Sequence, residues 1–344
     1  MAEQDLDSFL VSSAANRRYL SGFTGSNGQL VITADEAILA TDFRYIEQAQ
    51  SESPGFDVRH IRGGEPWFPA VAVEVGMHRI GFEADDMSVA AFSRLQREVE
   101  ESESDLRVDF EETAGVIEWI RAVKDGNEIE ALDRAVQIAD EAMAKIQREI
   151  RTGMTEQEVA WELHKEMRRL GAEGPSFDTI VAVGPNAALP HHRADDTVVR
   201  DGEPIVIDMG ATYRGYRSDL TRTFVVGEQD DTFQHIYGIV LQAQKAAIEA
   251  ARPGMTGEEI DSVAREVITD AGYGDEFGHG LGHGVGLVIH ERPMVVPRSQ
   301  DVVEDGMVFT IEPGIYISGW GGVRIEDVVV MEDDRARPLT RSPK

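Results

Sequence analysis

The chain contains no cysteine and no long apolar run, and each absence excludes a class of protein. Without cysteine there is no disulfide, no thiolate metal site and no cysteine nucleophile. Any bound metal must therefore be held by histidine and carboxylate side chains. No stretch approaches the length of a membrane span, and the first residues, MAEQDLDSFL, lack the basic and apolar parts of a signal peptide. We therefore expect a cytoplasmic protein of enzyme size with no membrane partner.

Positive charge is also scarce. The 344 residues include 63 acidic and 33 basic side chains, which gives a net charge of -30. Such an acidic surface repels nucleic acid and anionic membranes, and it argues against both as partners. Lysine occurs only five times, which favours a surface adapted to high salt over that of an ordinary acidic protein. We predict a halophilic source and loss of structure at low salt.

The first 124 residues alternate short strand and helix patterns, which is typical of a small α/β domain. A helix is predicted over Asp42–Ser51, and turn residues follow at Lys124–Asn127 before a long amphipathic helix. We therefore expect two domains, residues 1–124 and 125–344. The predicted strands of the first domain are Ser8–Ser12, Gln29–Thr33, Ala37–Thr41, Asp57–Ile61, Arg79–Phe82 and Leu106–Phe110.

The second part contains an internal repeat. At residue 151 the chain reads RTGMTEQEVAWELHKEMRRLGAEG, and at residue 252 it reads RPGMTGEEIDSVAREVITDAGYGD. Each copy is a helix with an N-terminal capping box and a glycine at its end. Further along, DGEPIVIDMG at 201 corresponds to EDGMVFTIEPG at 304, so that Asp208 falls opposite Glu312. Two copies predict a duplicated half-domain packed about a pseudo-two-fold axis.

Each copy is also predicted to contain a hairpin with an acid on both strands. In the first, a turn near Tyr213 would pair Asp208 with Asp219, with roughly 5 Å between their Cβ atoms. Glu312 and Glu326 repeat the arrangement in the second. Four converging acids exceed what one proton or one arginine can neutralise, so a divalent metal is the better explanation. The alternative is four unrelated surface acids, but their position within apolar, β-prone runs argues against it.

The remaining metal ligand should be histidine. The glycine-rich stretch FGHGLGHGVGLVIHERP supplies His279, His283 and His290, and its spacing differs from that of phosphate-binding loops. The segment LPHHR adds His191 and His192. Because His191 and His290 occupy similar places in the two copies, a functional role is favoured over chance surface positions.

Together these residues resemble the pita-bread metallopeptidases, the family of methionine aminopeptidase, Xaa-Pro aminopeptidase and prolidase. The segments NRRYLSGFTGSNG and ATDFRYIEQA resemble the N-terminal domain that prolidases, Xaa-Pro aminopeptidases and creatinases share. The resemblance implies an α/β fold class, with a creatinase-like α/β domain before a pseudo-two-fold pita-bread catalytic domain. The family's motif of two Asp, one His and two Glu is matched by Asp208, Asp219, His283, Glu312 and Glu326.

The resemblance also implies a role for each of these residues. Asp208 would bind one metal ion, His283 and Glu312 the other, and Asp219 and Glu326 would bridge the two. The ligand set suits two divalent ions, Mn, Co, Fe or Zn, of which Mn or Co is favoured. A hydroxide bridging the metals would be the nucleophile.

Other residues would act on the substrate. By resemblance, Glu312 would pass a proton to the leaving nitrogen, while His191 and His290 would polarise the scissile carbonyl. His279 and Arg324 are expected to support the metal ligands without binding metal themselves. For Arg324, contact with the substrate is the alternative.

Substrate specificity is expected to depend on the segment HERPMVVPR. Prolidases would be expected to have an arginine for the substrate carboxylate at the place of Met294, while Arg292 and Arg298 lie close by. The leading interpretation is a homodimeric enzyme that hydrolyses Xaa-Pro dipeptides, small peptides with proline in the second position.

Three alternatives to a dipeptidase are considered. The nearest is an Xaa-Pro aminopeptidase that cleaves longer peptides with the same residues. A creatinase is disfavoured, because its relatives lack the full carboxylate set. A non-catalytic binding relative is also disfavoured, because such proteins typically lose metal ligands and all five are present.

Overall fold

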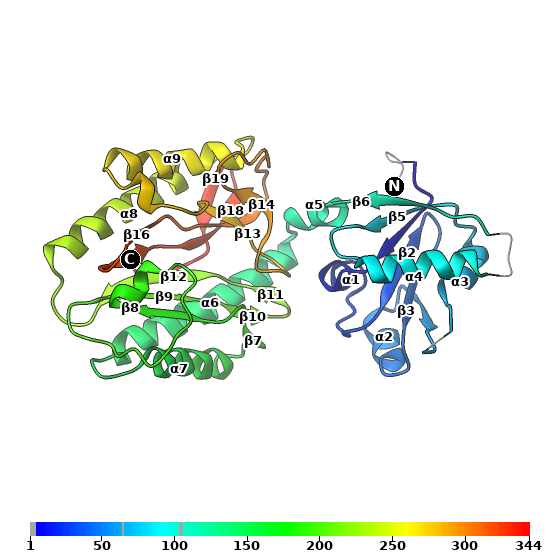
Figure 1. Ribbon diagram of the computed structural model, residues 1–344, viewed down its shortest axis with the longest axis horizontal. Coiled ribbons are helices and arrows are strands. Elements are labelled where there is room, and N and C mark those ends of the chain that lie inside the picture. Colours follow the sequence, from blue (N-terminus) through cyan, green and yellow to red (C-terminus); the bar gives the residue numbers. More distant parts are fainter. Residues whose placement is uncertain (1–4, 64, 103–105) are drawn as a thin grey trace. The chain divides into compact units, whose positions relative to one another are not determined.

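A computed structural model describes residues 5–63, 65–102 and 106–344. The chain divides into two compact units, Met1–Ile120 and Arg121–Lys344, and each is described by itself (Figure 1). Within the described residues, no helix has both the length and the apolar character needed to cross a bilayer.

The first unit is a six-stranded mixed sheet with helices packed against it (Figure 1). The strand order is β4-β3-β2-β1-β5-β6, and β1 pairs antiparallel with β2 but parallel with β5. Both faces are buried, because Leu10 packs in one apolar cluster while Phe9 and Val11 pack in another. The strands are β1 (Ser8–Val11), β2 (Gln29–Thr33), β3 (Ala37–Thr41), β4 (Asp57–His60), β5 (Arg79–Glu83) and β6 (Asp109–Thr113). The helices are α1 (Ala14–Ser21), α2 (Ile46–Glu52), α3 (Phe68–Val75) and α4 (Val89–Glu100). Helix α5 (Val116–Ala122) spans the division between the two units.

Two elements of this unit begin later than predicted, and several ends also differ from the prediction. Helix α2 begins at Ile46 rather than Asp42, because Asp42 starts a turn in which its carboxylate accepts hydrogen bonds from Arg44. The last strand begins at Asp109 rather than Leu106. The apolar side chains of Leu106 and Val108 pack against the core from irregular backbone, so their apolar character did not indicate strand pairing.

The second unit places strands between two pairs of helices (Figure 1). Helices α6 (Gly126–Glu149) and α7 (Glu156–Arg169) pack on β8, β9 and β12, while α8 (Asp231–Ala250) and α9 (Gly257–Asp270) pack on β15 and β18. In its first half lie β7 (Gly174–Pro175), β8 (Ile180–Val183), the 3₁₀ helix η2 (Gly184–Ala188), β9 (Pro204–Met209), β10 (Ala211–Tyr213), β11 (Tyr216–Arg217) and β12 (Leu220–Val225). In its second half lie η3 (Gly274–Glu276), β13 (Gly282–Gly284), β14 (Glu291–Val295), β15 (Val308–Ile311), β16 (Gly314–Ile317), β17 (Gly321–Arg324), β18 (Asp327–Glu332) and β19 (Arg335–Pro338).

The internal repeat is visible in matched local structure. Helices α7 and α9 are both 14 residues long, and both begin with a capping box in which a threonine and a glutamate satisfy each other's backbone amides. The two capping threonines, Thr155 and Thr256, also form equivalent isolated bridges, to Val198 and Val302. The two halves therefore share one folding pattern, as the repeat predicted.

The register of the first hairpin differs from the prediction. Asp208 lies opposite Thr221, not opposite Asp219. The turn is formed by Arg214 and Gly215, both with positive φ of 48° and 78°, as a two-residue hairpin turn requires. Since Thr221 and Asp219 are two residues apart, Asp219 lies on the same face as Asp208 but diagonally from it. In the second hairpin the prediction holds, because the flanking pairs Ile311–Asp327 and Gly314–Arg324 place Glu312 level with Glu326.

Candidate metal centre

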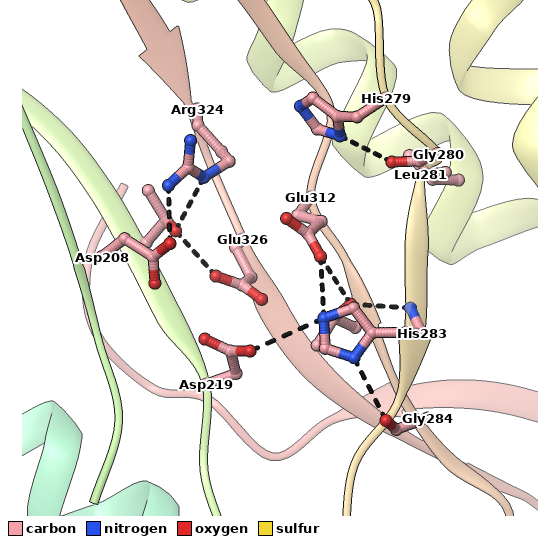
Figure 2. Close-up of polar contacts among 12 residues, drawn as sticks. Asp208, Asp219, His279, Gly280, Leu281, His283, Gly284, Glu312, Arg324 and Glu326 are labelled. Atoms are coloured by element: carbon pink, nitrogen blue, oxygen red, sulfur yellow. Dashed lines mark hydrogen bonds and ion pairs between the residues drawn. The ribbon is translucent and has the colours of Figure 1, made fainter. Parts of the chain in front are cut away.

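The five predicted metal ligands converge on one place in the second unit (Figure 2). Asp208 lies in β9, and His283 lies in β13. The other three lie where strands are interrupted: Asp219 directly before β12, Glu312 directly after β15, and Glu326 between β17 and β18. Breaks in strand pairing allow these side chains to leave the alternating pattern of a sheet and turn toward one point.

Three of the acids form a buried cluster. Oxygen atoms of Asp208, Asp219 and Glu326 all lie within 4.8 Å of one another. Burial, and then the charges of the neighbouring carboxylates, raise the pKa of Asp219 and of Glu326 well above their ordinary values. The cluster therefore opposes its own ionisation, and a bound cation would reverse that effect.

In two of these acids, one oxygen is held by the protein and the other is not. Asp208 accepts a 2.6 Å hydrogen bond from Arg324 through Oδ2, and Glu326 accepts a 2.7 Å bond from Thr221 through Oε2. Asp208 Oδ1 and Glu326 Oε1 are buried without a hydrogen-bond partner among the described residues. Buried oxygens without a donor are rare in proteins. These residues therefore fit a divalent cation, which would coordinate the two oxygens left over.

His283 and Glu312 complete the cluster. His283 Nε2 lies 3.2 Å from Glu312 and 3.7 Å from Asp219. Burial alone would lower the pKa of His283, but the bond to Glu312 outweighs it and raises that pKa. Burial likewise opposes ionisation of Glu312, yet contact with His283 lowers its pKa to about 2. The pair thus combines an imidazole nitrogen with a fully ionised carboxylate.

A hydrogen-bonded chain of side chains supports Asp208. Arg324, which is 3% exposed, donates to the hydroxyl of Tyr316 at 2.9 Å as well as to Asp208. That hydroxyl lies 2.9 Å from Nε2 of His279, whose Nδ1 lies 2.7 Å from the carbonyl of Gly280. Arg324 and His279 are therefore joined through the hydroxyl of Tyr316.

The acids open onto a cavity of about 390 Å³. His191 and His290, which are predicted to act on the substrate, both line this cavity. The ring centroids of His290 and His283 are 4.2 Å apart. Met294 also lines the cavity, together with the apolar side chains of Phe177, Ile180, Ile289 and Val296. Arg292 and Arg298 are not among its described lining residues.

Two buried glutamates hold the loops that carry the cavity histidines. Glu156 is fully buried and lies 2.7 Å from Nε2 of His192. Glu291, next to His290, is held by Lys124 at 2.8 Å and by Arg121 in a buried ion pair. Each histidine loop is thus anchored by a buried carboxylate that several groups of the protein contact, namely backbone amides and side chains for Glu156 and two cations for Glu291.

Several supporting residues were not found from the sequence. Thr221 could have been found with the correct register, because it lies two residues after Asp219 on the same face. Tyr316, Glu156 and Glu291 had no comparable signal, since their partners are distant in the chain and only the fold brings them together.

The fold and the site together define a two-domain protein. Its duplicated C-terminal domain surrounds a cluster of acids and one histidine of the kind that binds metal ions. Residues 130–333 match metallopeptidase family M24, and residues 1–123 match the creatinase/prolidase N-terminal domain. The chain belongs to metallopeptidase family M24 and is a peptidase, and the predicted fold class is confirmed.

Individual relatives resemble the chain over nearly its whole length. An Xaa-Pro dipeptidase of Pyrococcus furiosus is 40% identical over 345 residues, which is 100% of this chain and 96% of that protein. The solved structure of an Xaa-Pro dipeptidase from Bacillus anthracis has a TM-score of 0.95 at 41% identity, covering 100% of this chain and 95% of that one. The X-Pro aminopeptidase of Thermotoga maritima MSB8 has a TM-score of 0.90 at 40% identity, covering 98% and 96%.

Proposed function

We propose that this peptidase hydrolyses the peptide bond of Xaa-Pro dipeptides with two divalent metal ions. The observation that carries the proposal is the buried cluster of Asp208, Asp219 and Glu326, with His283 and Glu312 beside it, at the wall of a cavity of about 390 Å³. The Xaa-Pro dipeptidases similar to the chain support the substrate class.

We assign the ligands as the sequence motif predicts. Asp208 would hold one ion, His283 and Glu312 the other, and Asp219 and Glu326 would contact both. Mn or Co is favoured, because the ligand set is rich in oxygen and has a single imidazole. When bound, the two ions would activate a water molecule and stabilise the charge that develops on the carbonyl oxygen.

The chain's own residues then have separate tasks. Glu312, ionised and in contact with His283, is placed to accept a proton and deliver it to the leaving nitrogen. His191 and His290 line the cavity, where they would donate hydrogen bonds to the scissile carbonyl. The apolar lining side chains, such as Phe177 and Ile289, would pack on the proline ring, whose nitrogen has no hydrogen to donate.

Cleavage of longer peptides is the second candidate. A relative named X-Pro aminopeptidase is as similar to this chain as the dipeptidases are, so similarity alone does not separate the two activities. The same metal cluster would serve both. The distinction depends on whether the cavity binds a free carboxylate directly after proline.

The proposal is tested by measuring hydrolysis of Ala-Pro and Ala-Pro-Phe in high KCl with Mn, Co or Zn. We expect Ala-Pro to be the better substrate, with Asp208→Ala lowering activity by orders of magnitude. Asp270→Ala, an exposed acid at the end of α9, is the matched control and should keep full activity. Turnover like that of the wild type in Asp208→Ala would refute the metal assignment, and preference for Ala-Pro-Phe would favour the aminopeptidase.

Further features stay predictions from the sequence. We propose a functional division at residues 1–124 and 125–344, a homodimer, a cytoplasmic location and a surface adapted to high salt. The net charge of -30 supports the last of these. Light scattering of the purified protein in high salt measures the number of subunits directly.

A further inference from the structure

A dipeptide presents a free carboxylate directly after its proline, and selective binding of that group requires a cation in the cavity. This inference rests on the proposed function, because it concerns where the substrate carboxylate is bound. The cavity lining contains several acids but only two arginines, Arg193 and Arg324, among its described residues. Each of the two can be judged by the contacts it already makes.

Arg324 is already fully engaged. Its guanidinium donates to Asp208, to the hydroxyl of Tyr316 and, through Nε at 3.1 Å, to Thr221. The side chain is 3% exposed. A substrate carboxylate would have to displace one of these bonds, so Arg324 cannot serve as the cation without disturbing the metal ligand.

The arginines of the segment HERPMVVPR are directed elsewhere. Arg292 forms an ion pair with Asp301, which also accepts a hydrogen bond from the backbone amide of Met294. Arg298 does not line the cavity in the part of the chain that the structure describes. Met294 does line it, so this segment contributes an apolar wall rather than a charge.

Arg193 has none of these restrictions. It is exposed, lines the cavity, and makes no hydrogen bond or ion pair within the described residues. Its backbone is nevertheless fixed on both sides by Glu156, which lies 2.7 Å from the ring of His192 and accepts a 3.0 Å bond from the amide of Asp195. A cation without a protein partner therefore projects from an anchored loop, one residue after the cavity histidines.

We propose that Arg193 binds the free carboxylate of the substrate and makes this site selective for dipeptides. A guanidinium can donate two parallel hydrogen bonds to a carboxylate, which is the geometry that a terminal carboxylate offers. Arg193 would thus replace the cation that Met294 does not provide. It is a specificity-determining residue, and it takes no part in bond cleavage.

The test compares Ala-Pro with Ala-Pro-amide, which lacks the negative charge, in the Mn-loaded enzyme. We expect Arg193→Gln to raise KM for Ala-Pro about tenfold or more with little change in kcat, because charge-assisted hydrogen bonds are lost. Its KM for the amide should stay near that of the wild type. Arg193→Lys should restore part of the selectivity, since it returns the charge but not the paired donors. Arg200→Gln, an exposed arginine of the same segment, is the control and should behave as the wild type.

Each outcome separates this inference from the proposed function. If Arg193→Gln weakens Ala-Pro and Ala-Pro-amide equally, or weakens neither, the assignment of Arg193 is wrong while the peptidase activity stands. If the wild type hydrolyses neither compound with any of the metals, the proposed substrate class fails instead. Competitive inhibition provides a second readout: proline should inhibit the wild type more strongly than prolinamide, and Arg193→Gln should lose that difference.

Discussion

The hydroxyl of Thr221 donates a 2.7 Å hydrogen bond to Oε2 of Glu326 and so joins the two halves of the duplicated domain at the acid cluster. The backbone repeats the link, because the amide of Glu326 donates to the carbonyl of Thr221 at 3.1 Å. Thr221 also accepts a bond from Arg324. One small side chain thus fixes the orientation of an acid from the other half and leaves its second oxygen open.

Replacing Thr221 with valine removes the donor and keeps the shape of the side chain. We expect Thr221→Val to weaken Mn binding by about ten- to hundredfold, which is the usual effect of losing a group that orients a metal ligand. Metal titration by calorimetry measures the change. Thr212→Val, whose hydroxyl bonds to the carbonyl of Pro175 at an exposed position, should bind Mn as the wild type does. Unchanged affinity in Thr221→Val would show that Glu326 needs no such support.

Arg222 stabilises the same junction from the opposite side of the strand. All five of its N–H groups have acceptors: the carbonyls of Thr221, Glu326, Ser342 and Pro343, and the carboxylate of Asp327. The side chain is 1% exposed. Arg222→Met would remove the donors to Oδ1 of Asp327 and to four carbonyls, while Gln244 and Lys344 still contact Oδ2 of Asp327. We expect a loss of about 3–5 kcal/mol in the free energy of unfolding. Denaturant titration gives that value.

A second variant tests the reason for this loss. If the lost ion pair between Arg222 and Asp327 is the main cost, Asp327→Asn added to Arg222→Met should cost less than the sum of the two single changes. Arg337→Met is the surface control, because Arg337 pairs with Glu332 while both side chains are about 40% exposed. Its removal should cost less than about 1 kcal/mol. Strict additivity in the double variant would contradict the electrostatic explanation.

The sequence located most strands of the first unit and the repeat of the second, because both depend on local patterns. Short runs of β-prone apolar residues placed β2 and β3 at their observed bounds, and the threonine and glutamate of each capping box marked α7 and α9. Each of these patterns involves residues that are close together in the sequence, so it can be recognised without knowing the tertiary contacts.

Of the candidate site, the sequence predicted the five candidate metal ligands and the histidines near them, but not most of the contacts that support them. The five residues stand out because acids and a histidine are unusual in apolar or glycine-rich strands. The residues that hold the site in place make contacts between distant parts of the sequence, such as that of Glu291 with Lys124. No local sequence pattern predicts such contacts. The hairpin register was predicted wrongly because the turn was centred one position too early. That error shifted the predicted partner of Asp208 by two residues, from Thr221 to Asp219.

His164 gives the protein a stability that depends on pH. Burial lowers the pKa of His164, a half-buried residue whose Nε2 lies 3.0 Å from the hydroxyl of Thr179. Below pH 6.5 the unfolded chain therefore takes up a proton that the folded protein resists, so stability falls as the pH decreases through that range. We expect His164→Gln to show a smaller drop in Tm between pH 7.5 and pH 5.5 than the wild type. His78→Gln, at an exposed position, should show the same drop as the wild type, and an equal drop in His164→Gln would refute the assignment.

The net charge of -30 predicts that salt stabilises the folded protein. At 0.05 M KCl the acidic side chains repel one another over long distances, whereas at 2 M the screening length is only a few ångströms. We expect Tm to rise by several degrees between these two conditions, and circular dichroism to show lost structure after dialysis to low salt. The turn at Asp333 and Asp334 offers a local control, because both residues have positive φ and asparagine suits that backbone without the charge. Replacing both with asparagine should raise Tm more at 0.05 M than at 2 M KCl, and a Tm independent of salt would contradict the prediction.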